Sequence, residues 1–194
     1  VTITGTNDRP TIFTDTEVYD VTGAVTELDD GALGETTETL SDNGSITFAD
    51  VDITDTHSAD APVLKSFDST DPAFASAVGT FSLGSLTQTA GGAGGAQDWN
   101  FDVNDGVIDA LGEGEVITQV YTVTLRDDSG DVATEAVSQD VTVTITGTND
   151  RPTIFTDTEL YDVTGAVTEL DDGALGETTE TLSDEGSITF ADVD

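Results

Sequence analysis

Acidic side chains gather in a few short stretches of this chain instead of spreading evenly along it. Carboxylate and amide oxygens at such close spacing are the hard ligands of Ca²⁺, which takes roughly six to eight of them. Each stretch lies where the surrounding pattern predicts a loop at the end of a strand. The candidate ligands are Asn7 and Asp8; Glu27, Asp29 and Asp30; Asp50, Asp52 and Asp55; Asp127, Asp128 and Asp131; Asn149 and Asp150; and Glu169, Asp171 and Asp172.

None of these stretches has the sequence of an EF-hand loop. In the stretch that begins at Asp50, Asp55 stands where that loop needs glycine, and Ala61 stands where it needs a final glutamate. A single acidic pair is more typical of a solvated surface, whereas a linker together with a neighbouring acidic stretch favours calcium. The sequence therefore leaves two interpretations of the acids, calcium sites at the linkers and a solvated acidic surface.

The charge balance of the chain excludes several classes of partner. Acidic residues number 40 and basic residues four, which gives a formal net charge of −36. This charge repels nucleic acid and anionic lipid, so we expect neither as a partner. The chain also contains no apolar run long enough to span a membrane, and we expect no direct membrane insertion.

The sequence contains few of the residue types that commonly carry catalysis. The chain contains no cysteine and one histidine, His57, so neither a nucleophilic triad nor a zinc site can be assembled. We expect His57 to be a polar side chain in a loop. Two carboxylates alone can serve a glycosidase, but acids are so frequent here that one such pair carries no information. The sequence therefore predicts that the protein is not an enzyme.

Strands must position the acids, because apolar and polar residues alternate over much of the chain. Alternation with a period of two is typical of strands with one buried face. Trp99 falls on the inward face of its stretch, which predicts a core position. Short strands separated by turn signals indicate an all-β fold, an antiparallel β-sandwich. The alternating stretches are 45–48, 81–83, 99–103, 121–125 and 141–145, and the turn signals are 42–44, 90–96 and 127–131.

One segment, 105–112, is predicted to form a short helical turn instead. Ile108 and Leu111 are three residues apart and share one face. Asp105 could cap the start of the turn, and Gly112 could end it. We expect this turn to carry the chain from one sheet of the sandwich to the other.

The opening of the chain is repeated near its end. Shifted by 142 positions, residues 1–52 match residues 143–194 at all but two positions. A match of this length at one offset marks a tandem repeat, and we expect the chain to be part of a longer array. The predicted division is 1–8 as the last strand and linker of a preceding repeat, 9–148 as a complete sandwich repeat, and 149–194 as the linker and opening third of the next.

Two copies of the opening third thus share one copy of residues 53–142. We expect the first copy, 9–52, to complete the sandwich, because the chain leads from it directly into residues 53–142 and the loop to be closed is short. The alternative is a domain swap, in which residues 149–194 of one chain complete the sandwich of another.

The junction motif at 145–150, Ile-Thr-Gly-Thr-Asn-Asp, resembles that of the VCBS-type and related cadherin-like repeats of large bacterial adhesins. Residues 45–57 are similar to the central motif of the same family, and residues 99–115 and 121–125 are similar to its second half. The resemblance implies an Ig-like or cadherin-like sandwich in a giant adhesin of the RTX type, exported by type I secretion to the bacterial cell surface. It also implies calcium at the junctions, where Asn149 and Asp150 match the motif.

The function expected from this resemblance is that of a structural extender, or stalk. Calcium bound at the loops and linkers would stiffen the array, whose adjacent repeats are partners, and the array would project an adhesive tip for surface attachment or biofilm formation. The alternative is a module that binds carbohydrate or another surface ligand. Such a module needs exposed aromatic side chains or a flat threonine array, and the inward aromatic positions favour the extender.

Overall fold

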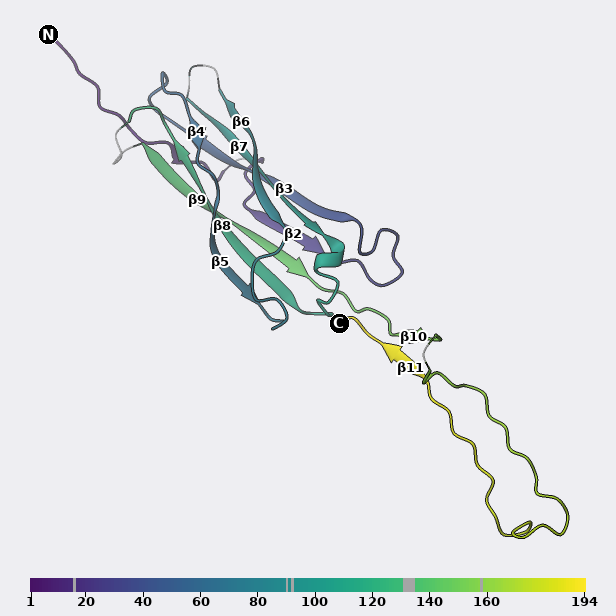
Figure 1. The fold of residues 1–194 in the computed structure, drawn as a ribbon. Helices are drawn as coiled ribbons and strands as arrows, with labels where there is room; N and C mark the ends of the chain where they lie inside the picture. The colour runs from purple at the N-terminus through teal and green to yellow at the C-terminus, as the bar shows by residue number, and fades with distance from the viewer. Residues whose placement is uncertain (16, 90, 92, 131–134, 158) are drawn as a thin grey trace. The chain divides into compact units, whose positions relative to one another are not determined.

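The computed structural model describes residues 1–15, 17–89, 91, 93–130, 135–157 and 159–194 (Figure 1). The chain divides into two compact units, Val1–Asn149 with Asp194, and Asp150–Val193. Among the described residues, no helix has the length and the apolar composition needed to span a membrane.

The first unit is built from two β-sheets, so the predicted all-β sandwich is confirmed. Neighbouring strands of the first sheet are all antiparallel, and β3 pairs with β7 along its whole length. In order across this sheet, the strands are β1 (Thr11–Ile12), β3 (Thr39–Ala49), β7 (Gly94–Asn104) and β6 (Thr80–Gln88).

The second sheet contains one pair that departs from the predicted antiparallel arrangement. Strand β2 runs parallel to β9, whereas β8 is antiparallel to β9, β4 and β5. In order across the sheet, the strands are β2 (Thr22–Thr26), β9 (Ala136–Thr146), β8 (Val116–Arg126) and β4 (Ser58–Ala59), and β5 (Val63–Ser69) also pairs with β8.

The core of the first unit lies between the inward faces of the two sheets. The burial of β8 alternates residue by residue, as its period-two sequence predicts. Each Å² of apolar surface that is removed from water stabilises such a sandwich by roughly 25 cal/mol. The buried apolar side chains are Val25, Ile46, Phe48, Trp99, Phe101, Val103, Ile108, Leu111, Ile117, Tyr121, Val123, Leu125, Val141, Val143 and Ile145.

Trp99 is completely buried and locks the first third of the unit onto the rest. Its indole N–H donates a hydrogen bond of 2.7 Å to the backbone carbonyl of Asp20. The ring lies directly against the backbone of Gly44, where an added Cβ would come within 2.6 Å of it. The turn predicted at 42–44 is therefore wrong: β3 runs straight through these residues, and Gly44 is needed for the close approach of Trp99.

The predicted helical turn is confirmed as a short 3₁₀ helix, η1 (Asp105–Val107), which follows β7 of the first sheet and leads to β8 of the second. Its details differ from the prediction. Asn104 stands at the N-cap position, and the turn ends before Gly112. The Asp105 carboxylate instead accepts hydrogen bonds from the backbone N–H groups of Leu28 at 2.9 Å and Thr36 at 2.8 Å. Asp105 thereby fixes the long loop between β2 and β3.

The glycine-rich stretch at 90–96 is predicted to be a turn between strands. Residues 90 and 92 lie outside the described residues, whereas Gly94, Gly95 and Ala96 belong to β7. A Cβ at Gly95 would collide with the backbone of Thr87 on the neighbouring strand. Glycine here permits close packing of two backbones, which the local sequence could not distinguish from a loop.

The second unit reproduces the local pairing of the first third of the chain. Strand β10 (Thr153–Phe155) pairs with β11 (Thr189–Ala191) in the register in which β1 pairs with β3. The isolated bridge between Asp162 and Ser187 likewise copies the bridge between Asp20 and Ser45. The opening third of the repeat thus specifies its own local hairpin, because its hydrogen bonds recur in both copies.

An ion pair on the second sheet gives a pH-dependent contribution to stability. The Lys65 ammonium group and the Thr122 hydroxyl donate hydrogen bonds to Asp140, and together they lower the pKa of that carboxyl. A depressed folded-state pKa contributes stability that is present above about pH 4, the unfolded value, and is lost as the pH falls through the folded value.

We therefore expect the Asp140→Asn variant to have a lower melting temperature than the wild-type protein at neutral pH. The difference should shrink as the pH is lowered below about 4, because wild-type Asp140 then becomes protonated as well. Melting curves recorded across this pH range test the expectation. The effect is small, since the pair is partly exposed to solvent. Curves that stay parallel at all pH values would contradict it.

Candidate metal centre

Three carboxylates converge at the end of the first unit where β3 and β8 finish. Asp50 directly follows β3, Asp127 directly follows β8, and Asp55 comes from the loop between β3 and β4. One oxygen from each lies within 4.8 Å of those of the others. We name Asp50, Asp55 and Asp127 the Asp127 cluster. The sequence placed Asp50 and Asp55 in one acidic stretch and Asp127 in another, and the fold brings the two stretches together.

The first linker is hydrogen-bonded to the Asp127 cluster and its surroundings. The Asn7 side-chain amide donates to Asp127 Oδ2 at 3.1 Å, and the Asp8 backbone N–H donates to Asp52 Oδ2 at 2.6 Å. The backbone N–H of Asp52 in turn donates to Asp50 Oδ1 at 2.9 Å. The acids predicted for the linker and for the 50–55 stretch therefore lie in one connected network.

The environment shifts the pKa values of the cluster in opposite directions. Burial acts to raise the pKa of Asp127, but hydrogen bonds from Ser129 and Asn7 outweigh it and leave the pKa lowered. The pKa of Asp55 is raised, first by burial and then by the negative charges of Asp52 and Asp50. Asp55 Oδ2 is buried and has no hydrogen-bond partner among the described residues. Ionised Asp55 is thus the uncompensated member of the cluster.

His57 lies in the loop between β3 and β4, as expected, and its side chain is buried beside the cluster. Its Nδ1 lies 2.7 Å from the Gln88 side-chain nitrogen, and its Nε2 lies 2.9 Å from Asp50 Oδ2. Because the amide nitrogen must donate, Nδ1 accepts, and Nε2 carries the proton that it donates to Asp50. His57 therefore orients the Asp50 carboxylate from the side of the core, where its ring also packs on Phe48.

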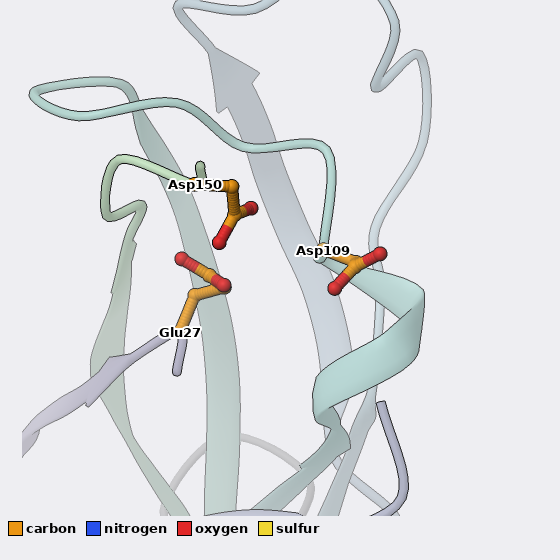
Figure 2. Close-up of side chains that lie close together, drawn as sticks. All are labelled: Glu27, Asp109 and Asp150. Atoms are coloured by element: carbon orange, nitrogen blue, oxygen red, sulfur yellow. The ribbon is translucent and has the colours of Figure 1, made fainter. Parts of the chain in front are cut away.

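A second group of carboxylates, Glu27, Asp109 and Asp150, lies at the opposite ends of these strands, and we name it the Glu27 cluster (Figure 2). Glu27 directly follows β2, Asp109 follows η1, and Asp150 follows β9. One oxygen from each lies within 4.8 Å of those of the others. Figure 2 shows the three carboxylates directed toward one space.

Glu27 is almost fully buried and ties the end of β2 to the segment that follows β9. Its backbone N–H donates to the carbonyl of Thr146 at 3.0 Å. Its Oε2 accepts hydrogen bonds from the backbone N–H of Thr148, at 2.8 Å, and from the hydroxyl of the same residue. The carboxylate is therefore held in place by the residues that lead into the Asn149-Asp150 motif.

The other predicted ligands lie outside both clusters. Asp128 accepts hydrogen bonds from the backbone and the hydroxyl of Thr56, which lower its pKa. The exposed residues are Asn149, Asp29, Glu169, Asp171 and Asp172, and Asp30 is half-buried. Asp131 lies outside the described residues.

Sequence reasoning missed Asp109 as a candidate ligand. It lies between Ile108 and Leu111, both of which are buried in the core. These two anchors fix the turn that carries Asp109 beside Glu27. The apolar spacing of the turn was visible in the sequence, but the neighbour of its acidic residue depends on how the turn crosses between the sheets.

The donor set of both clusters fits a hard divalent cation. Ca²⁺ binds oxygen at about 2.4 Å, so two ligands of one ion lie at most about 4.8 Å apart. The oxygens of each cluster meet this limit. Lys65 pairs with Asp140, and Arg126 pairs with Asp60 and Glu135, which are acids outside both clusters. The clusters thus combine the right ligand atoms with the right spacing.

The comparisons with known proteins do not assign this chain to a family. No protein-family model and no curated protein matches the chain. Among solved structures, the N-terminal domain of PorA is similar over 71% of this chain and 95% of that one, at 11% sequence identity and a TM-score of 0.35. The class that the structure itself defines is a β-sandwich followed by a partial repeat of its own first third.

Proposed function

We propose that this protein is an extender repeat of a cell-surface adhesin, stiffened by calcium bound at the two ends of the sandwich. The observation that carries the proposal is the Asp127 cluster, whose carboxylates come from two loops. The linker residue Asn7 donates a hydrogen bond to Asp127, and the linker residue Asp8 donates one to the neighbouring Asp52. An ion held there would join the linker to the body of the repeat.

The repeat arrangement supports the same proposal. The Asn-Asp pair occurs twice, as Asn7-Asp8 and as Asn149-Asp150. The first copy contacts the Asp127 cluster, and Asp150 of the second copy belongs to the Glu27 cluster. In a tandem array, one linker would therefore serve the cluster of the preceding repeat through its aspartate and that of the following repeat through its asparagine.

The proposed mechanism is electrostatic. Two carboxylates 4.8 Å apart repel each other by roughly 3 kcal/mol at an effective dielectric constant of 20. When bound, calcium would replace this repulsion by attraction to a shared cation. The residues that would hold it are Asp50, Asp55 and Asp127 at one end and Glu27, Asp109 and Asp150 at the other. The chain itself supplies the orientation, through His57 on Asp50 and Thr148 on Glu27.

The resemblance of the junction motif to VCBS-type and cadherin-like repeats supports a place on the bacterial cell surface, reached by type I secretion. Extracellular calcium modules bind with dissociation constants of about 10⁻⁴–10⁻³ M. Such sites would be filled outside the cell and empty in a cytosol that is poor in free calcium. The chain would thus be loose before export and stiff afterwards.

Calcium titration of the protein tests the proposal. At a calcium concentration about 100 times the dissociation constant, binding stabilises the folded state by about 2.7 kcal/mol, which corresponds to a rise in melting temperature of roughly 5–10 °C. The rise should be reversed by a chelator and accompanied by a larger maximum dimension in solution X-ray scattering. If neither quantity responds to calcium, the acids only solvate the surface, and glycan binding becomes the next property to measure.

The Asp55→Asn variant distinguishes a role of Asp55 in calcium binding from a role in the stability of the calcium-free fold. Because the pKa of Asp55 is raised, its charge destabilises the calcium-free fold at neutral pH. We therefore expect the variant to melt at a higher temperature than the wild type without calcium, and to gain less from calcium. Asp102→Asn is the matched control, since Asp102 is exposed on β7 outside both clusters. Equal gains from calcium in the wild type and both variants would overturn the assignment of Asp55.

A further inference from the structure

The outermost strands of the two sheets carry backbone groups to which a further strand could hydrogen-bond. Such an open edge is a template for pairing with another chain. The edges of the first sheet are β1 and β6, and those of the second sheet are β2 on one side and β4 with β5 on the other. In the described part of the chain, no strand pairs with the outer side of any of them. Strand β1 is only two residues long, so the edges that could add a strand are those of β2, of β6, and of β4 with β5.

The edge of β2 is closed by two aspartate side chains. The backbone N–H of Glu27 donates to β9, so the odd-numbered residues of β2 direct their backbone groups toward β9 and the even-numbered ones direct theirs away from it. The outward N–H of Thr22 donates to Asp20 Oδ1 at 3.0 Å. The outward N–H of Ala24 donates to Asp42 Oδ2 at 2.7 Å. Both donors are therefore already used, and a further strand would meet two carboxylates, which only accept hydrogen bonds.

The other two edges lie together on the opposite side of the sandwich. Asp42 joins β3 to β2 on the first side. On the other side, the side-chain nitrogen of Gln88, at the end of β6, lies 2.7 Å from Nδ1 of His57, which directly precedes β4. The chain enters this unit beside the Asp127 cluster and leaves it beside the Glu27 cluster. Neighbouring repeats would therefore attach at the two ends of the sandwich, and the side formed by β6, β4 and β5 would face solvent or another molecule.

One extra residue interrupts β5. The pairing of β5 passes from Leu64 directly to Ser66 while β8 advances by a single residue, so Lys65 forms a β-bulge. A bulge bends and twists its strand and interrupts the ladder of hydrogen bonds. Lys65 also places a charged, largely exposed side chain on this edge, and Pro62, between β4 and β5, has no N–H to donate. This edge is therefore neither straight nor fully furnished with donors.

A second bulge interrupts β6, where Gly84 and Ser85 together stand opposite the single residue Asp98 of β7. The side-chain amide of Gln97 donates to the carbonyl groups of Gly84 at 3.2 Å and Ser85 at 3.5 Å. Gln97 is almost fully buried, so it holds these two carbonyls from the side of the core. The bulge thereby withdraws two acceptors from the edge, and this is the role that the structure gives to a buried glutamine in an otherwise apolar interior.

We propose that the two bulges keep the β5 and β6 edges from pairing with a second copy of this chain, so that copies lying side by side stay separate. An identical sandwich is the partner to be excluded, because two copies related by a twofold axis would bring the same edge strand together in antiparallel orientation. All of the strands involved belong to the first unit, so the inference does not involve residues 150–194. It does not depend on calcium.

Each bulge can be removed by deleting one residue without changing the register of its strand. After deletion of Lys65, Leu64 and Ser66 become neighbours and keep their pairing residues on β8. The edge of β5 then becomes regular. Lys65→Ala is the matched control, because it removes the charge and keeps the bulge.

Deletion of Ser85 does the same for β6. Gly84 alone then stands opposite Asp98, and Leu83 and Leu86 stay on the inward face, where they pack against the core. Ser85→Ala is the control that keeps the bulge. Because the two deletions affect different sheets, each tests the proposal separately.

The wild type, the two deletion variants and the two alanine controls are compared by sedimentation velocity at one high protein concentration. A chelator is present, and about 1 M salt shortens the screening length to about 3 Å, so that the acidic surfaces hardly repel each other. We expect each deletion to raise the association constant at least roughly tenfold over the wild type, because an added strand gains several backbone hydrogen bonds. The alanine controls should associate no more than the wild type.

Amide hydrogen exchange shows where the new contact forms. In an associated deletion variant, the outward-facing amides of the repaired strand should become protected, while those of β7 and β8 stay protected as in the wild type.

Three results would overturn the proposal. Deletion variants that are folded and associate no more than the wild type would show that the bulges do not protect the edges. Alanine controls that associate as strongly as the deletions would assign the protection to a side chain and not to the bulge. Association accompanied by loss of protection in β7 and β8 would show that unfolding, and not pairing at an edge, joins the copies.

Discussion

Replacing Trp99 with alanine should lower the free energy of unfolding of the first unit by about 3–5 kcal/mol, the range found for large aromatic side chains removed from a core. Trp99 is completely buried, and its ring lies between Phe81 and the backbone of Gly44. The loss is large beside the roughly 5–15 kcal/mol by which domains are stable. Urea unfolding, followed by circular dichroism, measures it.

Trp99→Phe is the control for this experiment, because it keeps an aromatic ring but removes the N–H that donates to the carbonyl of Asp20. We expect it to cost clearly less than alanine, since only part of the volume and one hydrogen bond are lost. If alanine and phenylalanine cost the same small amount, Trp99 does not fasten the first third of the unit to the body.

Replacing Asp105 with alanine is the second change with a large expected effect, about 3–5 kcal/mol. The carboxylate is completely buried and accepts charge-assisted hydrogen bonds from Leu28 and Thr36, each of which contributes roughly 1.5–3 kcal/mol. Without it, the two N–H groups lose their acceptor. Thr36 would also lose the contact that holds its backbone at a φ of 60°, a strained conformation for threonine.

Asp105→Asn should cost less than Asp105→Ala, because the amide oxygen can still accept one of the two hydrogen bonds. Urea unfolding again gives the free energies, and amide hydrogen exchange of Leu28 and Thr36 shows whether the loop has loosened. A loss of less than about 1 kcal/mol for alanine, with unchanged exchange, would show that the loop is held by other contacts.

Much of this fold could be predicted from the sequence because strand alternation is a local signal. Residues 99–103, 121–125 and 141–145 alternate and lie in β7, β8 and β9. Glycine misled the prediction where its role depends on a distant residue. Gly44 is read locally as a turn, yet it stays in β3 because Trp99 of the neighbouring strand packs on it.

The candidate site was predictable in composition but not in grouping. The sequence placed Asp50, Asp55 and Asp127 in acidic loops, and only the fold puts residues from β3 and β8 side by side. Asp109 was missed because its neighbours depend on where η1 crosses between the sheets. Asp105 was assigned to a cap, whereas its carboxylate holds the loop between β2 and β3. Long-range pairing decides such neighbours, and it leaves no trace in local periodicity.

The parallel pairing of β2 with β9 decides how the unit responds to tension. These strands lie near the start and the end of the repeat, so a pull on the chain from both sides drags them in opposite directions along one axis. The residue pairs from Thr22↔Thr142 to Thr26↔Thr146 are then loaded together, in shear, whereas a hairpin pulled at its open end loses its pairs one after another. In a tandem array of such repeats, a pulling force would therefore be shared by several residue pairs at once.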